Sequence, residues 1–203
     1  MVHAAAVFAL LSLPASAGPA IPFEASLAEL RSSVLAARAQ IKSDGLAREL
    51  SDLAAEANRL DWQAERLRRA VQDLRWRAQR SSPGRPGQPP SDPFLRSDID
   101  RLTWDLRDLQ FDSQRARDRA SRAEQAAAKD PALVEPAKRF SGEAQRFAST
   151  AQWLSSDARW TAMDLRRIGY SMEAWDLERL SGDASRAADD LRGSSARILS
   201  KVQ

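Results

Sequence analysis

The side chains that most often transfer protons or attack substrates are nearly missing from this chain. It contains no cysteine and a single histidine, His3. Serine therefore has no visible base partner, and the usual nucleophile and base pairs cannot form. A carboxylate pair remains an alternative, but acids interleaved with bases along a helix usually form a solvated face. We expect no catalytic residues and no enzymatic activity.

Metal, cofactor and nucleic-acid sites are equally poorly supported. The sequence has no Glu-x-x-His or EF-hand pattern, and without cysteine it lacks the usual zinc or haem ligands. The 31 basic residues are nearly balanced by 28 acidic ones and are spread along the chain. Nucleic-acid binding usually requires a basic stripe or a known module. We therefore expect no metal, no cofactor and no nucleic-acid partner.

Tryptophan carries the most distinctive pattern. The motif Trp-x-(Ala/Leu)-x-x-Leu occurs four times, once in each long helix expected below, and three further aromatics stand seven or 14 residues from a motif tryptophan. The motif begins at Trp62, Trp104, Trp160 and Trp175, and the additional aromatics are Trp76, Phe111 and Trp153. These seven residues are our candidates for either an interaction surface or a second packing stripe.

Two hypotheses account for these aromatics. In the first, they pack a third and a fourth helix, which buries at least three of the four motif tryptophans and leaves Trp76 and Trp153 exposed. In the second, they form an exposed ladder for a glycan, a lipid or a partner helix. We favour burial, because six exposed tryptophans would present roughly 1,000 Å² of apolar surface, more than soluble monomers usually tolerate.

Prolines mark the helices that must carry these residues. Five of the ten prolines fall in a Pro/Gly/Ser loop over residues 81–93, and none interrupts residues 24–80, 97–129 or 137–203. Between these breaks, apolar residues recur at alternating spacings of three and four. The clearest run is Leu46, Leu50, Leu53, Ala57, Leu60, Ala64, Leu67, Val71, Leu74 and Ala78. Such a 3.5-residue period predicts left-handed packing of helices.

The predicted fold is all-α. It is an antiparallel helical bundle, or an elongated coiled-coil-like rod, of four long helices plus a short leading helix, with helices at about 24–42, 46–80, 97–129, 132–168 and 170–200. Gly45 and Gly169 stand where the heptad phase jumps, so we expect a turn or sharp kink at each. Ser97 with Asp100 resembles a capping box, and Asp130 followed by Pro131 resembles an N-cap with proline at N1.

Charge predicts the direction in which the first two long helices pair. The helices over 46–80 and 97–129 each begin acidic and end basic, so antiparallel packing places opposite charges together at both ends. Folding back at the proline loop brings together residues whose numbers sum to about 176. Leu74 should then face Leu102, and Leu67 should face Leu109.

The first 17 residues resemble a secretory signal peptide. They carry no charged side chain, run apolar from Ala4 to Leu13, and end in the small-x-small sequence Ala15-Ser16-Ala17. Their apolar run is too short to span a bilayer. We expect an exported chain, periplasmic or extracellular, with residues 18–203 as a single helical domain. Helix packing must then stabilise the domain without disulfides.

The sequence thus favours a non-enzymatic interaction or scaffold protein of the cell envelope or extracellular space. A protein partner or self-association is the leading expectation. The alternative is a peripheral protein that binds lipid or glycan through a stripe of tryptophans. A membrane-surface helix usually has a cationic polar face, whereas acids here nearly match bases.

Overall fold

The computed structural model describes residues 23–81 and 94–203, and from Glu29 onward it also describes the side chains. Its helices are α1 (Phe23–Arg80), α2 (Leu95–Ala126), the short 3-10 helix η2 (Pro131–Leu133), α3 (Val134–Arg167) and α4 (Ser171–Val202). The described residues contain no strand, so the predicted all-α bundle is confirmed. The chain forms two compact units that divide between Ile41 and Lys42. The expected signal peptide lies outside the described residues.

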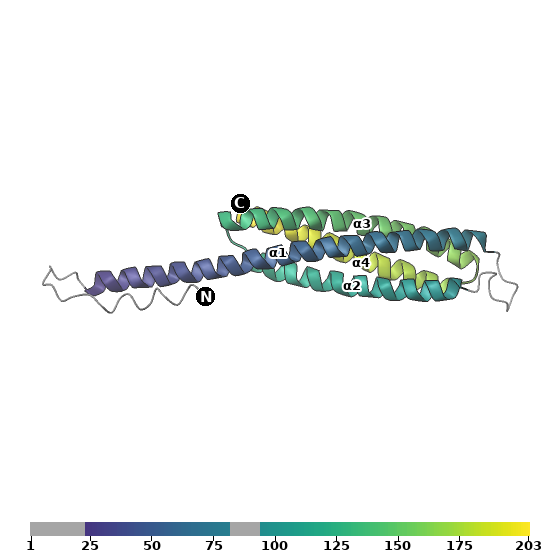
Figure 1. Ribbon diagram of the computed structural model, residues 1–203, viewed down its shortest axis with the longest axis horizontal. Coiled ribbons are helices and arrows are strands. Elements are labelled where there is room, and N and C mark those ends of the chain that lie inside the picture. Colours follow the sequence, from purple (N-terminus) through teal and green to yellow (C-terminus); the bar gives the residue numbers. More distant parts are fainter. Residues whose placement is uncertain (1–22, 82–93) are drawn as a thin grey trace. The chain divides into compact units, whose positions relative to one another are not determined.

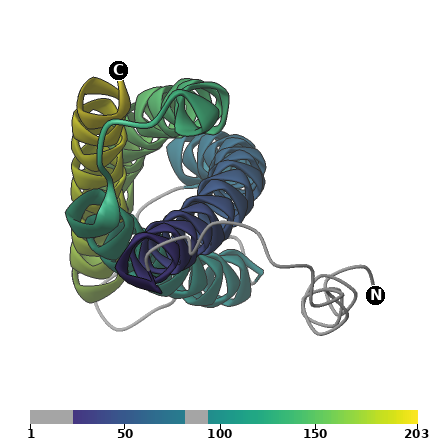
Figure 2. The ribbon, with the colours of Figure 1, turned by 90° about the vertical axis from the view of Figure 1, so that its left-hand side faces the viewer.

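The second unit is a four-helix bundle (Figure 1). Viewed along its axis, the helices surround a common core, with α2 and α3 at opposite corners (Figure 2). The core consists of the predicted heptad residues, which are leucines and alanines in the main, with Phe140 and Phe147 as the largest fully buried side chains. Every residue of the run from Leu50 to Ala78 is buried, while Leu46 is half-buried against the core.

Contacts between α1 and α2 confirm the antiparallel hairpin and its register. Arg77 pairs with Asp98, and Arg119 pairs with Glu56, so the residue numbers in each pair sum to 175. These contacts join the basic end of one helix to the acidic beginning of the other, as the charge pattern predicted. Arg119 also contacts Glu49 at 3.0 Å, and this hydrogen bond raises the pKa of the Arg119 guanidinium.

Polar contacts join two pairs of parallel helices, α1 with α3 and α2 with α4. Between α1 and α3, the contacts Asp61–Thr150, Arg68–Asp157 and Arg75–Asp164 each join residues whose numbers differ by 89. Between α2 and α4, the contacts Gln110–Asp183, Arg117–Asp190 and Glu124–Arg197 each join residues whose numbers differ by 73. A constant difference means that both helices run in the same direction. Each pair of helices therefore carries a ladder of three polar contacts, one every seven residues.

The connection from α2 to α3 crosses the end of the bundle between opposite corners (Figure 2). Asp130 fixes it by three contacts: its side chain accepts hydrogen bonds from the Ala132 amide and the Ser43 hydroxyl, and its amide donates to the Val202 carbonyl. The Ser43 and Ala132 contacts lower the pKa of the Asp130 carboxyl. The predicted N-cap at Asp130 and Pro131 is thus present, although it begins η2 rather than an α-helix.

Some predicted helix boundaries are wrong. The capping box at Ser97 and Asp100 is absent: α2 begins two residues earlier, and the Ser97 hydroxyl instead donates to the Phe94 carbonyl. The turn or kink at Gly45 is also absent, because α1 continues through this residue. Glycine inside a helix costs about 1 kcal/mol but does not prevent helical geometry. At Gly169 the predicted turn is confirmed, with a φ of 102° that favours glycine.

The first unit contributes the beginning of α1. Its side chains from Glu29 to Ile41 are exposed, including Leu30, Val34 and Leu35. The apolar spacing that predicted a separate leading helix at 24–42 is therefore helical, but it belongs to α1 and is covered by none of the described residues. Apolar residues that pack against no core do not have to keep the heptad phase of the bundle. The helix can therefore continue through the phase change at Gly45 without a turn or kink.

The parallel ladder between α1 and α3 is testable because the chain has no native cysteine. Asp61→Cys combined with Thr150→Cys should form a disulfide under mild oxidation, since the native side chains are in contact at 2.5 Å. Asp61→Cys combined with Asp164→Cys is the matched control, because the second site lies two heptads, about 21 Å, further along α3. Efficient closure of the control pair, with none of the first, would exclude this register.

Candidate interaction surface: a belt of tryptophans

The predicted burial of the motif tryptophans is wrong. Trp62, Trp104, Trp160 and Trp175 are all exposed, and so are Trp76, Trp153 and Phe111, with exposed fractions between 51% and 67%. Exposure was expected only for Trp76 and Trp153. All seven candidate residues therefore stand on the surface of the bundle.

The spacing of the seam explains this exposure. Trp62 lies two residues after Leu60 and two residues before Ala64, both of which are buried. Two residues correspond to about 200° around a helix, so a residue flanked in this way points directly away from the core. Trp76 stands in the same relation to Leu74 and Ala78. This flanking pattern was visible in the sequence and would have predicted the exposure.

Small side chains, instead of tryptophan, form the additional packing stripes of α3 and α4. These residues recur every seven positions beside the heptad seam, and all of them are buried. They are Ala148, Ser155 and Ala162 on α3, and Ala174, Ser181, Ala188 and Ser195 on α4. The Ser181 and Ser195 hydroxyls donate to the helix carbonyls of Glu178 and Arg192, which satisfies them inside the helix. Each serine therefore packs like a small apolar residue. Sequence reasoning missed this stripe because it searched for large side chains.

The seven aromatics lie at one level of the bundle. The registers described above place Phe111 and Trp104 opposite residues 64 and 71 of α1, and they place Trp153 and Trp160 opposite the same two residues. By the register between α2 and α4, Trp175 is level with residue 102 of α2. Together with Trp62 and Trp76, these residues span about 21 Å of the bundle axis. We call this set the tryptophan belt.

The belt surrounds the half of the bundle nearer the end of α1. It includes residues from all four helices, whereas the buried phenylalanines Phe140 and Phe147 lie towards the other end, opposite residues 51 and 58 of α1 by the same register. The tryptophans thus encircle one half instead of gathering on one face.

Arginine stacks on five of the six tryptophans. Two of these contacts join different helices, with the Arg68 guanidinium 5.7 Å from the ring centre of Trp153 and Arg75 at the same distance from Trp160. The other three lie within one helix and are Arg80 on Trp76 at 3.8 Å, Arg107 on Trp104 at 5.3 Å and Arg179 on Trp175 at 5.1 Å. Such contacts contribute about 0.5–1 kcal/mol at exposed sites. The indole rings are thereby oriented while remaining open to solvent.

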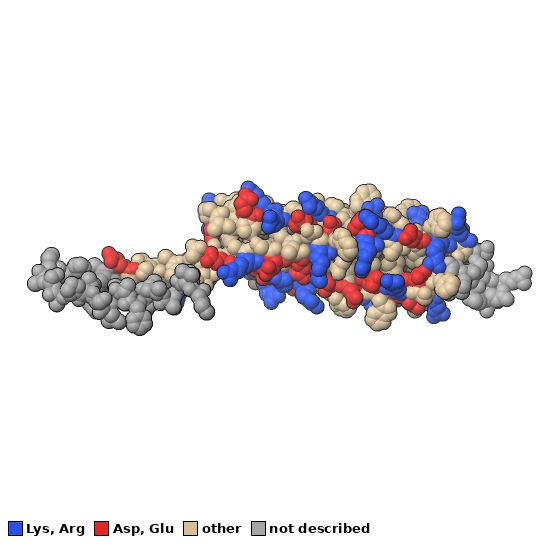
Figure 3. All heavy atoms as spheres, viewed as in Figure 1, with Lys and Arg blue, Asp and Glu red and all other residues tan. Residues whose placement is uncertain are grey.

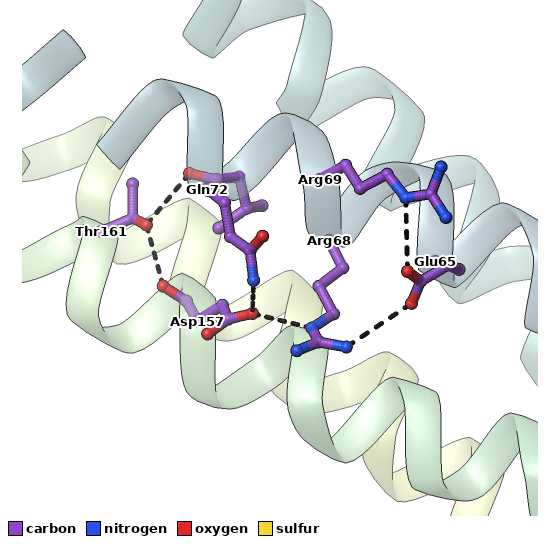
Figure 4. A network of polar contacts seen from close by, with 7 residues as sticks. Glu65, Arg68, Arg69, Gln72, Asp157 and Thr161 are labelled. Carbon is purple, nitrogen blue, oxygen red and sulfur yellow. Dashed lines mark hydrogen bonds and ion pairs between the residues drawn. The ribbon is translucent and has the colours of Figure 1, made fainter. Parts of the chain in front are cut away.

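Arg68, which lies between α1 and α3, is itself fixed by carboxylates (Figure 4). The Asp157 carboxylate accepts from Arg68 at 2.9 Å and from the Gln72 amide at 2.8 Å. Asp157 also contributes its backbone carbonyl, which accepts from the hydroxyl of the buried Thr161 at 2.8 Å. Glu65 contacts Arg68 from the other side at 3.6 Å. Trp153 therefore rests on a side chain with very little freedom.

The same arrangement recurs one heptad further along both helices. Arg75 and Gln79 donate to the Asp164 carboxylate at 3.3 Å and 3.0 Å, and Arg75 lies under Trp160. The structure thus presents two equivalent units, each with a tryptophan, an arginine, an aspartate and a glutamine. They are offset by seven residues, which corresponds to about 10.5 Å.

A groove between α1 and α2 lies at the same level. It has a volume of about 330 Å³, an apolar floor that includes Leu67, Leu74 and Leu102, and charged walls that include Arg66 and Asp105. Both signs of charge line it, and Figure 3 shows the same interleaving over the visible face of the bundle. The groove therefore gives the surface at the level of the belt a hollow, but it does not concentrate charge of one sign.

Neither a metal cluster nor a membrane-spanning helix is found within the described residues. No group of three or more histidine, cysteine or acidic residues is arranged to hold a metal there. No described helix is long and apolar enough to cross a membrane.

Comparison with known proteins gives no relative. No protein-family model, curated protein or solved structure matches this chain.

Replacing single belt tryptophans by alanine should change stability only slightly. For Trp62, Trp104, Trp160 and Trp175 we expect losses below about 2 kcal/mol, because each removes an exposed ring and at most one stacking contact. Phe147→Ala, which empties a fully buried site, should cost about 3–5 kcal/mol and serves as the comparison. Chemical unfolding measures both. A tryptophan variant as destabilised as Phe147→Ala would contradict the surface assignment, as would blue-shifted, poorly quenched emission from the native protein.

Proposed function

We propose that this chain is a non-catalytic, exported binding protein that contacts a protein partner through the tryptophan belt. One observation carries the proposal: six tryptophans, five of them stacked on arginine, are held open to solvent at one level of a rigid bundle. Large exposed apolar surfaces on soluble proteins usually mark interaction sites.

The composition of the belt favours a protein partner. Tryptophan and arginine are two of the residue types most enriched at the energetic centres of protein interfaces. An arginine that is already oriented by an aspartate, as Arg68 is by Asp157, loses little conformational freedom on binding. A partner that covers such a unit would gain contact area at low entropic cost.

A lipid or glycan ligand is the alternative. The open tryptophan faces favour it, because an indole ring can bind a sugar face or the interface of a membrane. Interfacial helices, however, usually present a cationic polar face. The belt instead interleaves arginine with Asp157, Asp164 and Asp176, each of which accepts an ion pair. The balance of charge therefore supports a protein surface over an anionic membrane.

The residues available for chemistry support a binding role over an enzymatic one. The Asp157 and Asp164 carboxylates of the belt are bound by arginine, and no histidine or cysteine follows His3 in the sequence. The buried hydroxyls of Ser113, Ser181 and Ser195 donate to backbone carbonyls, that of Ser113 to Leu109 at 2.6 Å. General acid–base or nucleophilic catalysis would need carboxylates or hydroxyls that are not already held in ion pairs or in hydrogen bonds to the backbone.

Site-specific photo-crosslinking tests the belt as a contact surface. A photoreactive phenylalanine analogue at Trp62 or Trp104 should give a discrete cross-linked partner in the native cell envelope. The same analogue at Ala55 or Gln125, which are also exposed and occupy the equivalent outward position of α1 and α2, should not. Cross-links from the two control sites alone would move the interface away from the belt. Lipid or glycan adducts in place of a protein band would favour the alternative.

Export is tested by the mature N-terminus. When the chain is produced in a Gram-negative host, the protein recovered from the periplasm should begin at Gly18, after the small-x-small sequence that ends at Ala17. Replacing Ala17 by arginine should block this cleavage. Recovery of protein that still begins at the original N-terminus, in the cytoplasmic fraction, would contradict the export assignment.

A further inference from the structure

Trp153 and Trp160 form the most regular part of the belt. Both project from α3, each is backed by an arginine of α1, and they are separated by seven residues, about 10.5 Å along the helix. Their exposed fractions are 60% and 51%, so at least half of each residue is accessible to a ligand. Two oriented indole rings at this distance form a surface with a defined period.

The chain itself contains a sequence with a similar period. Between α1 and α2, the sequence from Pro83 to Pro93 reads Pro-Gly-Arg-Pro-Gly-Gln-Pro-Pro-Ser-Asp-Pro. It holds three Pro-x-x-Pro steps, beginning at Pro83, Pro86 and Pro90. Segments of this kind favour the polyproline II helix, which repeats every three residues, or about 9.3 Å. Prolines three residues apart therefore recur at almost the spacing of the two tryptophans.

We propose that the paired tryptophan units of α1 and α3 bind a proline-rich segment in the polyproline II conformation, and that the occupant is residues 82–93 of a second copy of this chain. This inference rests on the proposed role of the belt as a protein contact surface. Proline-rich segments dock on aromatic-lined surfaces elsewhere, because their extended conformation is already populated before binding and costs little entropy.

The two tryptophan units supply the chemistry that such a segment requires. Proline rings three residues apart would pack on the exposed indole rings of Trp153 and Trp160, while Arg68 and Arg75 help to hold these rings in position. A polyproline II backbone has no internal hydrogen bonds. The Gln72 and Gln79 amides each lie one turn from the arginine of their unit and bind the same aspartate as that arginine, so each unit also holds an amide group that could hydrogen-bond to the backbone of the ligand.

Chain length favours a second copy over the molecule's own segment. Trp153 contacts Arg68, which is 13 residues, about 20 Å, from Ser81 along α1. A segment that ran along both tryptophans and returned to Phe94 would have to cover about 40 Å without any allowance for its turn. Twelve extended residues reach at most about 40 Å. A neighbouring molecule has no such constraint.

Fluorescence titration tests the site directly. The probe is a synthetic peptide of residues 82–93, added to the whole mature protein. Saturable quenching or shift of tryptophan emission is expected, and Trp160→Ala should weaken binding at least about tenfold, or 1.4 kcal/mol. Trp76→Ala is the matched control, because it removes an equally exposed, arginine-stacked ring elsewhere. A peptide with alanine at every proline should not bind. Melting curves confirm that each variant is folded.

Self-association tests the occupant. Sedimentation velocity of the wild-type protein should show oligomers that grow with concentration, and both Trp160→Ala and the replacement of the prolines at 86, 89 and 90 by alanine should abolish them. A wild-type protein that binds the peptide but remains monomeric would overturn the second copy as occupant. Absence of peptide binding, with cross-links still formed at Trp62 and Trp104, would overturn this inference and leave the proposed function standing. Failure of both experiments would remove both.

Discussion

The seven-residue repeat is the constraint on which the rest of the structure depends. It places leucine and alanine on one side of every long helix, and the same period fixes what lies on the remaining sides. Between parallel neighbours it produces ladders such as Arg68–Asp157 followed by Arg75–Asp164. Each exposed or half-buried contact contributes little by itself. Because these contacts recur every seven residues, however, together they select one register and one direction for each pair of helices. The apolar seams alone would be compatible with several registers.

The sequence was sufficient for those features that depend on periodicity and on charge along a single helix. The buried seam, the α1–α2 hairpin with its register and the turn at Gly169 were all predicted and are confirmed. The turn predicted at Gly45 is wrong, because α1 continues through this residue. A glycine is compatible with both a turn and a continuous helix, and the surrounding structure decides between them. The parallel pairing of α1 with α3 depends on contacts between residues 89 positions apart, which no local pattern reveals.

The candidate surface was found by sequence, but its exposure was misjudged. At least three of the four motif tryptophans were expected in the core, because large apolar side chains usually belong there. Two physical facts reverse this expectation. Trp62 and Trp76 stand opposite the seam, and arginine stacks on five of the six tryptophans, which stabilises these rings at the surface. Small residues such as Ser181 take the packing role instead.

The preference for arginine in the ion pairs has a consequence for the environment in which the protein can work. After His3 the sequence contains no histidine and no cysteine, so no side chain has an ordinary pKa between those of the carboxylates and those of tyrosine and lysine. Contacts such as Arg68–Asp157 and Arg75–Asp164 are built from arginine and aspartate alone. By residue type alone, the formal charge of its side chains therefore changes little between the range in which carboxylates titrate and the range in which tyrosine and lysine do. The belt contains neither histidine nor cysteine, so the side chains that most often switch a contact near neutral pH are not part of it.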